Sequence, residues 1–246
     1  MVSPANGNDK TLVVIGAGGR TGRPLVKQAL ARGYHVRAVE HTPSLAPAEN
    51  LERMSADILE DDLSDVVAGA DAVFSTIGLP LGPMAVMDPP PLYTEGMLRV
   101  TKAMKAARVS RLLVISAAFV EPDNGAPLWF RQSAGKALRH IFRQMADMER
   151  LLKASEGIDW TAVRPGWLLD QPMTTDYQVD ADHLPRGAFR TRHGDLAHFM
   201  LETAFTEEWV HRTPFIARRE PLRYASPPAL FAELAEQGLS QLSRGN

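Results

Sequence analysis

The chain has 246 residues, enough for one large α/β domain with a full core. Its formal charge of −2 disfavours nucleic acid or an acidic membrane surface as a partner, and its 45% hydrophobic content excludes a disordered chain. Cysteine is absent, which excludes disulfides, thiol nucleophiles and cysteine ligands, so any redox chemistry needs a bound cofactor.

The first ten residues are polar and carry no apolar stretch of signal-peptide length. The longest apolar run, near residues 112–120, is too short to span a bilayer. We therefore expect a cytoplasmic protein whose partner is a small molecule, with no nucleic acid and no membrane. No sequence pattern selects an oligomeric state.

Short apolar segments alternate with segments of helical period through the first two thirds of the chain. This alternation predicts a Rossmann-like, doubly wound α/β fold with a parallel sheet. The predicted strands are Thr11–Ile15, His35–Glu40, Arg53–Ala56, Asp71–Ile77, Arg111–Ile115 and Trp160–Val163. The predicted helices are Arg23–Arg32, Asp61–Ala68, Tyr93–Ala107, Gln132–Ser155, Asp195–Thr206 and Pro228–Gln241.

Two stretches rich in proline and glycine, Leu79–Leu92 and Glu121–Leu128, directly follow strands. In an open parallel sheet such loops lie at the carboxyl edge, where ligands bind. Residues 171–192 sustain neither period, so we expect a small irregular cap on the substrate side. We predict a single domain over 1–246, with a core at about 11–165 and the cap and C-terminal helix at 166–246.

A glycine-rich turn follows the first strand and precedes a helix: Gly16, Gly18, Gly19, Arg20, Thr21 and Gly22. Glycines permit a tight turn and a close backbone approach to a pyrophosphate, and the helix N-terminus attracts the anion. The turn therefore predicts binding of a nicotinamide dinucleotide, NAD(P)(H). The alternative is a tight βα turn that binds no nucleotide.

The second strand ends in Glu40 and His41, where the ribose of such a cofactor is expected. A carboxylate there accepts hydrogen bonds from both ribose hydroxyls and repels a 2′-phosphate, which tilts the prediction slightly toward NAD. His41 and Arg20 favour the opposite choice, because both are able to bind that phosphate. A solvated strand end is the alternative interpretation of this pair.

Six further segments carry a family resemblance: 16–22, 71–78, 111–117, 164–166, 170–174 and 194–201. Through them the chain, from about Thr11 to Ala217, resembles the atypical short-chain dehydrogenase/reductase superfamily. The branch it resembles contains biliverdin reductase B and the flavin reductases. The resemblance implies cofactor contacts at Asp57, Ile58, Thr76, Ile77, Gly78, Ser116, Ala117 and Pro165.

The resemblance breaks at the catalytic residues. The wider superfamily uses a Tyr-x-x-x-Lys pair on the helix after the fifth strand, and the segment 137–152 contains neither residue. Ala117 and Trp167 stand where the branch has a hydroxyl and a histidine. No catalytic acid is therefore carried over from the family.

Hydride transfer to a flavin or another conjugated acceptor needs mainly two well-placed rings, and a proton donor is optional. We predict that Phe119, Trp129, Trp167 and Tyr177, with Phe130, line an aromatic substrate pocket. Ordinary core packing is the alternative for each of them.

If a proton moves, we favour Ser116 as the catalytic residue, with Tyr93, Tyr177, His183 and His193 as further candidates. A hydroxyl that caps the backbone is the alternative for Ser116.

Three other features receive an interpretation from the sequence. Arg164 holds a loop or a substrate anion, or forms an internal ion pair. Asp147 and Glu149 lie among basic residues and are interpreted as a solvated, charge-paired helix face. No histidine spacing fits a zinc site, so no metal is predicted.

The leading hypothesis is an NAD(P)H-dependent oxidoreductase of the flavin or biliverdin reductase type, acting on a small aromatic or conjugated substrate. The missing Tyr-Lys pair motivates a second hypothesis, a non-catalytic NAD(P)-sensing regulatory protein. Glu40 suits a third, an epimerase or dehydratase with tightly bound NAD.

Overall fold

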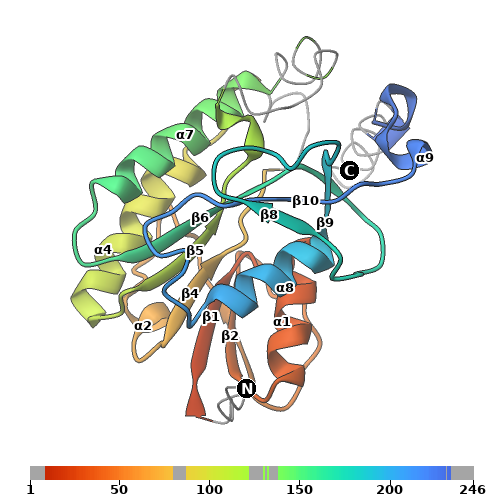
Figure 1. The fold of residues 1–246 in the computed structure, drawn as a ribbon. Coiled ribbons are helices and arrows are strands. Elements are labelled where there is room, and N and C mark those ends of the chain that lie inside the picture. Colours follow the sequence, from red (N-terminus) through yellow and green to blue (C-terminus); the bar gives the residue numbers. More distant parts are fainter. Residues whose placement is uncertain are drawn as a thin grey trace.

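Helices cover both faces of a central, mostly parallel sheet (Figure 1). The computed structural model describes residues 9–79, 87–121, 130, 132, 138–230 and 232–233. The strand order is β3-β2-β1-β4-β5-β6-β10-β8, and β8 alone of these runs antiparallel to its neighbour. The strands are β1 Thr11–Ile15, β2 His35–Glu40, β3 Leu51–Ser55, β4 Ala72–Ser75, β5 Arg111–Ile115, β6 Asp159–Pro165, β8 Gln178–Asp180 and β10 Phe215–Ala217. The Rossmann-like fold predicted from the sequence is confirmed.

The direction of chain winding reverses between β1 and β4, which are paired in parallel. In open α/β sheets a crevice forms at the carboxyl ends of the strands at such a switch point, and ligands bind there. The fold therefore directs attention to the residues that follow β1, β4, β5 and β6.

Burial on both faces explains the apolar strands. Leu12 and Val14 pack into one hydrophobic cluster, and Val13 and Ile15 pack into the other. Alternate residues of a strand point to opposite faces, so a strand covered on both sides has to be apolar throughout.

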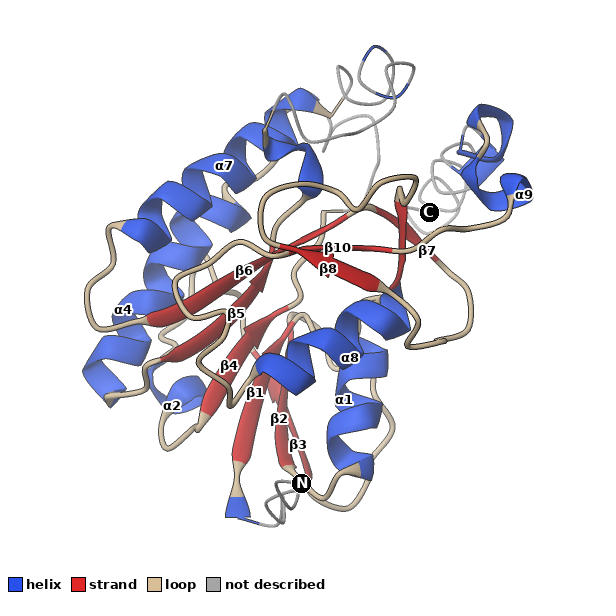
Figure 2. Cartoon of the chain, in the orientation of Figure 1, coloured by secondary structure: helices blue, strands red, loops and turns tan. Residues whose placement is uncertain are grey.

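The two clusters belong to two helical layers (Figure 2). On one face lie α1 Gly22–Ala31 and α8 His193–Thr203; on the other lie α2 Ser64–Val67, α4 Met97–Ala107 and α7 Arg139–Lys153. Three short elements complete the set: a π-helical turn η2 at Leu92–Gly96, a 3₁₀ turn η3 at Ala118–Val120, and α9 Leu222–Ala225. No helix in the described ranges is long and apolar enough to cross a membrane.

Several predicted boundaries need correction. The helix predicted at Asp61–Ala68 is only the four residues of α2, and the one predicted from Tyr93 begins as the π-helical turn η2. Helix α7 begins at Arg139, and residues 133–137 of its predicted range lie outside the described residues. The same holds for 80–86 and 122–128 in the two loops and for most of Pro228–Gln241.

The prediction that 171–192 is irregular is wrong in part. That region contains β8 and β9 Arg190–Arg192, and β9 pairs in parallel with β7 Trp167–Leu169 in a separate two-stranded sheet. β7 and β10 were also missed. Strands of three residues are too short to display a period of two.

Candidate functional site

The backbone of the glycine-rich turn is packed so closely that some of its positions admit only glycine. Gly16 has φ +81°, and a Cβ on Gly22 would lie 2.2 Å from the Gly16 carbonyl oxygen. The amide of Gly19 donates to that same carbonyl oxygen at 3.0 Å, which closes the turn. Helix α1 begins at Gly22 with no side chain capping its amides. Such a helix N-terminus is a ready site for a phosphate.

The turn opens into a cavity of about 410 Å³ at the carboxyl ends of β1, β4, β5 and β6. This cavity brings together eleven of the residues predicted from the sequence: Gly19, Arg20, Thr21, Thr76, Ile77, Gly78, Ser116, Ala117, Phe119, Pro165 and Trp167. The phosphate turn and the position expected for the nicotinamide are therefore joined by one continuous space.

Glu40 lies at the outer end of the turn, where a ribose is expected. A Cβ on Gly18 would lie 1.9 Å from Glu40 Oε2, so only glycine leaves room for this carboxylate. Ser44 donates to the carboxylate through its amide at 3.2 Å and through its hydroxyl at 2.5 Å. Arg23 ties the group together by donating to the Gly18 carbonyl and to Ser44 Oγ. Ser44 and Arg23 were not singled out from the sequence.

The remaining residues predicted for the adenosine end are arranged differently from one another. The His41 side chain is 80% exposed, with Nε2 3.8 Å from Asp57 Oδ2. The other carboxylate oxygen of Asp57 accepts from the Leu59 amide. Ile58 is buried in the core against Gly96. None of the three lines the cavity described above.

Ser116 forms the floor of the cavity and belongs to a buried charged group. Its hydroxyl lies 2.6 Å from Glu149 Oε1, and Glu149 also accepts two hydrogen bonds from Arg164, at 2.9 and 2.5 Å. Glu121 reaches the same guanidinium from the exposed side, at 2.7 Å. Burial opposes the charge of Arg164, but the bonds to Glu149 and Glu121 prevail and raise its pKa.

This arrangement corrects one interpretation made from the sequence and decides between the alternatives left open by another. Glu149 is 3% exposed and is not part of a solvated face, whereas Asp147 does pair with Arg150 at the surface. Arg164 is held by the internal ion pair. The sequence carried one signal for Glu149: it lies four residues after Met145 and three before Leu152, on the buried stripe of α7.

Two further titratable groups line the cavity. Burial raises the pKa of Tyr93 to about 12, against a hydrogen bond with the Leu79 backbone. Burial, aided by the charge of Arg20 and opposed by Asp170, lowers the pKa of His193 to about 4. The His193 ring is held by Thr21, whose hydroxyl lies 2.8 Å from Nδ1.

Two of the sequence candidates lie elsewhere. Tyr177 is not among the residues that line the cavity; its hydroxyl bonds His198 Nδ1 at 2.8 Å, and its ring packs on Phe199. This corrects its assignment to the substrate pocket. His183 is about half exposed and pairs with Asp180 outside the cavity. Tyr177 thus lies against α8, and His183 lies beside Asp180 of β8.

An aromatic wall closes the far side of the cavity. Phe119 and Trp167 line it, with ring centroids 6.3 Å apart, and Phe142 joins them from α7 at 5.5 Å from Phe119. Phe130 is 1% exposed and supports Phe119 from behind at 4.4 Å. Trp129, also predicted to line the pocket, lies outside the described residues.

Helix α7 faces the cavity with apolar side chains: Ile141, Phe142 and Met145, preceded by Leu138. Flat, apolar ligands are favoured by such a wall.

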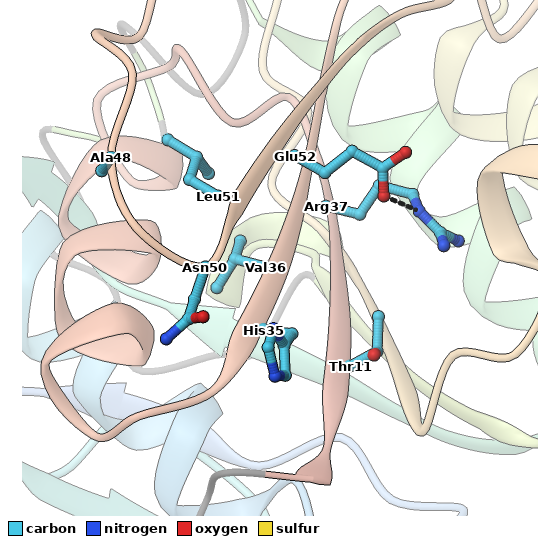
Figure 3. Close-up of a pocket in the computed structure, with 8 residues that line it drawn as sticks. All are labelled: Thr11, His35, Val36, Arg37, Ala48, Asn50, Leu51 and Glu52. Atoms are coloured by element: carbon cyan, nitrogen blue, oxygen red, sulfur yellow. Dashed lines mark hydrogen bonds and ion pairs between the residues drawn. The ribbon is translucent and has the colours of Figure 1, made fainter.

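A second hollow, of about 390 Å³, lies at the opposite edge of the sheet, at the starts of β1, β2 and β3 (Figure 3). Its one charged pair is already internal, because Arg37 Nε bonds Glu52 at 2.9 Å. Ligands of open α/β sheets bind at the carboxyl edge, so this hollow is not a candidate site.

The donor set fits a nicotinamide dinucleotide. The turn leaves no room for a Cβ at Gly18 or Gly22, its last residue begins a helix, and it opens directly into the cavity. The described residues contain no group of three acidic or histidine side chains able to hold a metal ion.

A family model described as NAD(P)H-binding matches residues 16–207. The chain belongs to this NAD(P)H-binding family. An uncharacterized chloroplastic protein of Arabidopsis thaliana is 28% identical over 242 residues, which cover 93% of this chain and 84% of that protein.

Two solved structures share the fold. A candidate NADH-flavin reductase from Streptococcus pneumoniae superposes with a TM-score of 0.68 at 21% identity, over 85% of this chain and 100% of its own. A short-chain dehydrogenase/reductase from Veillonella parvula, solved in complex with NADP, gives a TM-score of 0.67 at 16% identity, over 86% and 95% of the two chains.

Proposed function

We propose that this protein is an NAD(P)H-dependent oxidoreductase that reduces a small, flat aromatic or conjugated acceptor of the flavin type. The observation that carries the proposal is the continuity of the cavity from the glycine turn at Gly19 to the aromatic wall of Phe119 and Trp167. The bound cofactor would supply the hydride. The chain supplies the binding site for the cofactor and the acceptor.

The side chains in the cavity that carry a dissociable proton are poor proton donors. This supports an acceptor that needs no proton from the protein. At neutral pH Tyr93 holds its proton too tightly, with a pKa of about 12, and His193, with a pKa of about 4, is a neutral imidazole and not a protonated acid. Ser116 directs its proton to Glu149. A general acid works best when its pKa lies near the operating pH, and neither Tyr93 nor His193 meets that condition. A flavin or quinone, which takes its proton from water, fits such a site.

Glu40 supports a slight preference for NAD within this proposal. The hydroxyl and amide of Ser44 hold its carboxylate over Gly18. A fixed negative charge there opposes a 2′-phosphate. The affinities for NADH and NADPH, measured in the wild type and in Glu40→Gln, test this preference. The substitution should bring the affinity for NADPH closer to the affinity for NADH. Equal affinities in the wild type would remove the preference and leave the reductase proposal intact.

The decisive experiment is an anaerobic assay of NADH and NADPH oxidation at 340 nm with riboflavin, FMN and menadione as acceptors. We expect turnover with at least one of them, and a raised KM in Phe119→Ala. The matched control is Phe205→Ala, which removes a phenylalanine 42% exposed at the end of α8 and away from the cavity. Cofactor binding without any oxidation would refute the reductase proposal in favour of the NAD(P)-sensing alternative. Cofactor retained through purification would instead favour the epimerase or dehydratase alternative.

The residues after 165 support the expected substrate-side cap. Trp167 and Leu168, both of β7, line the cavity, and β7 pairs with β9 outside the main sheet. We infer that this part of the chain positions the acceptor together with Phe119 and Phe142, while the glycine turn and the residues after β4 position the cofactor.

A further inference from the structure

The buried group at the floor of the cavity fixes the direction of one hydrogen bond. Glu149 accepts two bonds from the guanidinium of Arg164 and is therefore ionised, because arginine stays protonated in proteins. An ionised carboxylate has no proton to give. The proton in the 2.6 Å contact between Ser116 Oγ and Glu149 Oε1 therefore belongs to the serine.

A serine hydroxyl has one proton and two lone pairs. Because the proton of Ser116 is directed away from the cavity, the oxygen has only lone pairs to offer to a ligand. The three residues are each 2–3% exposed, so water does not compete for this arrangement. The buried charges hold one another in place, and Arg164 is anchored a second time by Glu121.

We propose that Glu149, backed by Arg164, is a positioning residue that makes Ser116 a hydrogen-bond acceptor toward the cavity, so that the ligand group bound there is an N–H or O–H donor. This inference rests on the proposed function and deepens it, because it names what the site selects for. It also replaces the role of Ser116 as a proton donor. The ligand donor comes from one of two sources: the carboxamide of a nicotinamide ring, or a ring N–H of a flavin-type acceptor.

Apolar lining residues make this polar contact selective. Ala117, Ile141 and Met145 line the same cavity and offer no side-chain hydrogen bond. A ligand carbonyl placed against Ser116 would face a lone pair and lose its hydrogen bond with water. Leaving a buried polar group unpaired is costly, so the acceptor discriminates against such ligands.

The first arm of the test uses cofactor binding alone. NAD⁺ or NADP⁺, whichever binds more tightly, is titrated against its 3-acetylpyridine analogue, in which a methyl group replaces the amide NH₂. We expect the wild type to prefer the carboxamide by about fivefold, the worth of one neutral hydrogen bond. Ser116→Ala should abolish the preference. Glu149→Gln should reduce it, because the glutamine amide is able to donate to Ser116 and release the serine proton.

The second arm measures the affinity of the protein for lumiflavin and for 3-methyllumiflavin. Binding of each flavin is monitored by the quenching of its own fluorescence. A preference of similar size for the N–H form, lost in Ser116→Ala, places the donor on the acceptor molecule. Glu121→Gln is the matched control in both arms, since it removes a carboxylate from the same Arg164 without replacing the partner of Ser116. It should leave both preferences unchanged.

Each result bears on the proposal. A Ser116-dependent preference in either arm supports it and identifies the source of the donor. Equal ratios in wild type and Ser116→Ala in both arms overturn it. Ser116→Ala removes a single buried hydroxyl and decides the matter even if Glu149→Gln does not fold. Because both arms measure binding, a donor preference without turnover would refute the reductase proposal and leave this inference standing.

Discussion

Replacing Glu149 by methionine should destabilise the protein strongly. The substitution removes three hydrogen bonds at once, two from Arg164 and one from Ser116, and leaves a buried guanidinium without its main partner. Breaking a buried ion pair costs about 3–5 kcal/mol. Glu121 still contacts Arg164 Nη1, so we expect the lower end, about 3 kcal/mol.

In a chain of this length a loss of about 3 kcal/mol lowers Tm by roughly 6–12 °C, which calorimetry or circular dichroism measures directly. The reference variant is Glu202→Met, because Glu202 pairs with Arg32 at 2.7 Å but is 53% exposed. An exposed pair of this kind is worth about 1 kcal/mol or less. The difference between the stability losses of Glu149→Met and Glu202→Met therefore reports the effect of burying the ion pair.

The double variant Glu149→Met, Arg164→Met sharpens the reasoning. Removing both charges avoids the unpaired guanidinium, so the double variant should be more stable than Glu149→Met alone. The description of a coupled buried pair is refuted if Glu149→Met loses no more stability than Glu202→Met. It is also refuted if the stability losses of the single variants Glu149→Met and Arg164→Met simply add in the double variant.

Three further outcomes are expected. Gly22→Ala should weaken cofactor binding at least tenfold or prevent folding, because its Cβ would meet the Gly16 carbonyl oxygen at 2.2 Å; an unchanged Kd for NADH would contradict this. Stability of the wild type should fall as pH drops from 6.5 toward 4, because the unfolded chain takes up a proton that folded His193, with its pKa of about 4, does not. Urea unfolding across that range should show a shallower loss in His193→Gln. Tyr177→Phe should cost about 1 kcal/mol of stability through the bond to His198 and leave the KM for the acceptor unchanged; a raised KM would return Tyr177 to the substrate pocket.

The sequence was sufficient for features that depend on local spacing. The strand, glycine turn and helix around Gly16–Gly22 follow one another without interruption, and the observed β1 has the predicted bounds. Residues that end parallel strands, such as Thr76 and Ser116, were correctly expected at one edge of the sheet, because the topology places all carboxyl ends there.

The tertiary structure alone decided what those residues contact. The sequence left three possible roles open for Arg164, and only its distance to Glu149 selects the ion pair. Glu149 itself comes from a helix 15 residues earlier in the chain, and a local pattern assigns a charged residue among other charges to the surface. Tyr177 follows the segment 170–174 in sequence, but it packs on α8, where its hydroxyl bonds His198 and its ring contacts Phe199. Spacing along a chain determines which residues share a face or an edge, whereas the partner across the interior depends on how separate elements pack, and no local period records that.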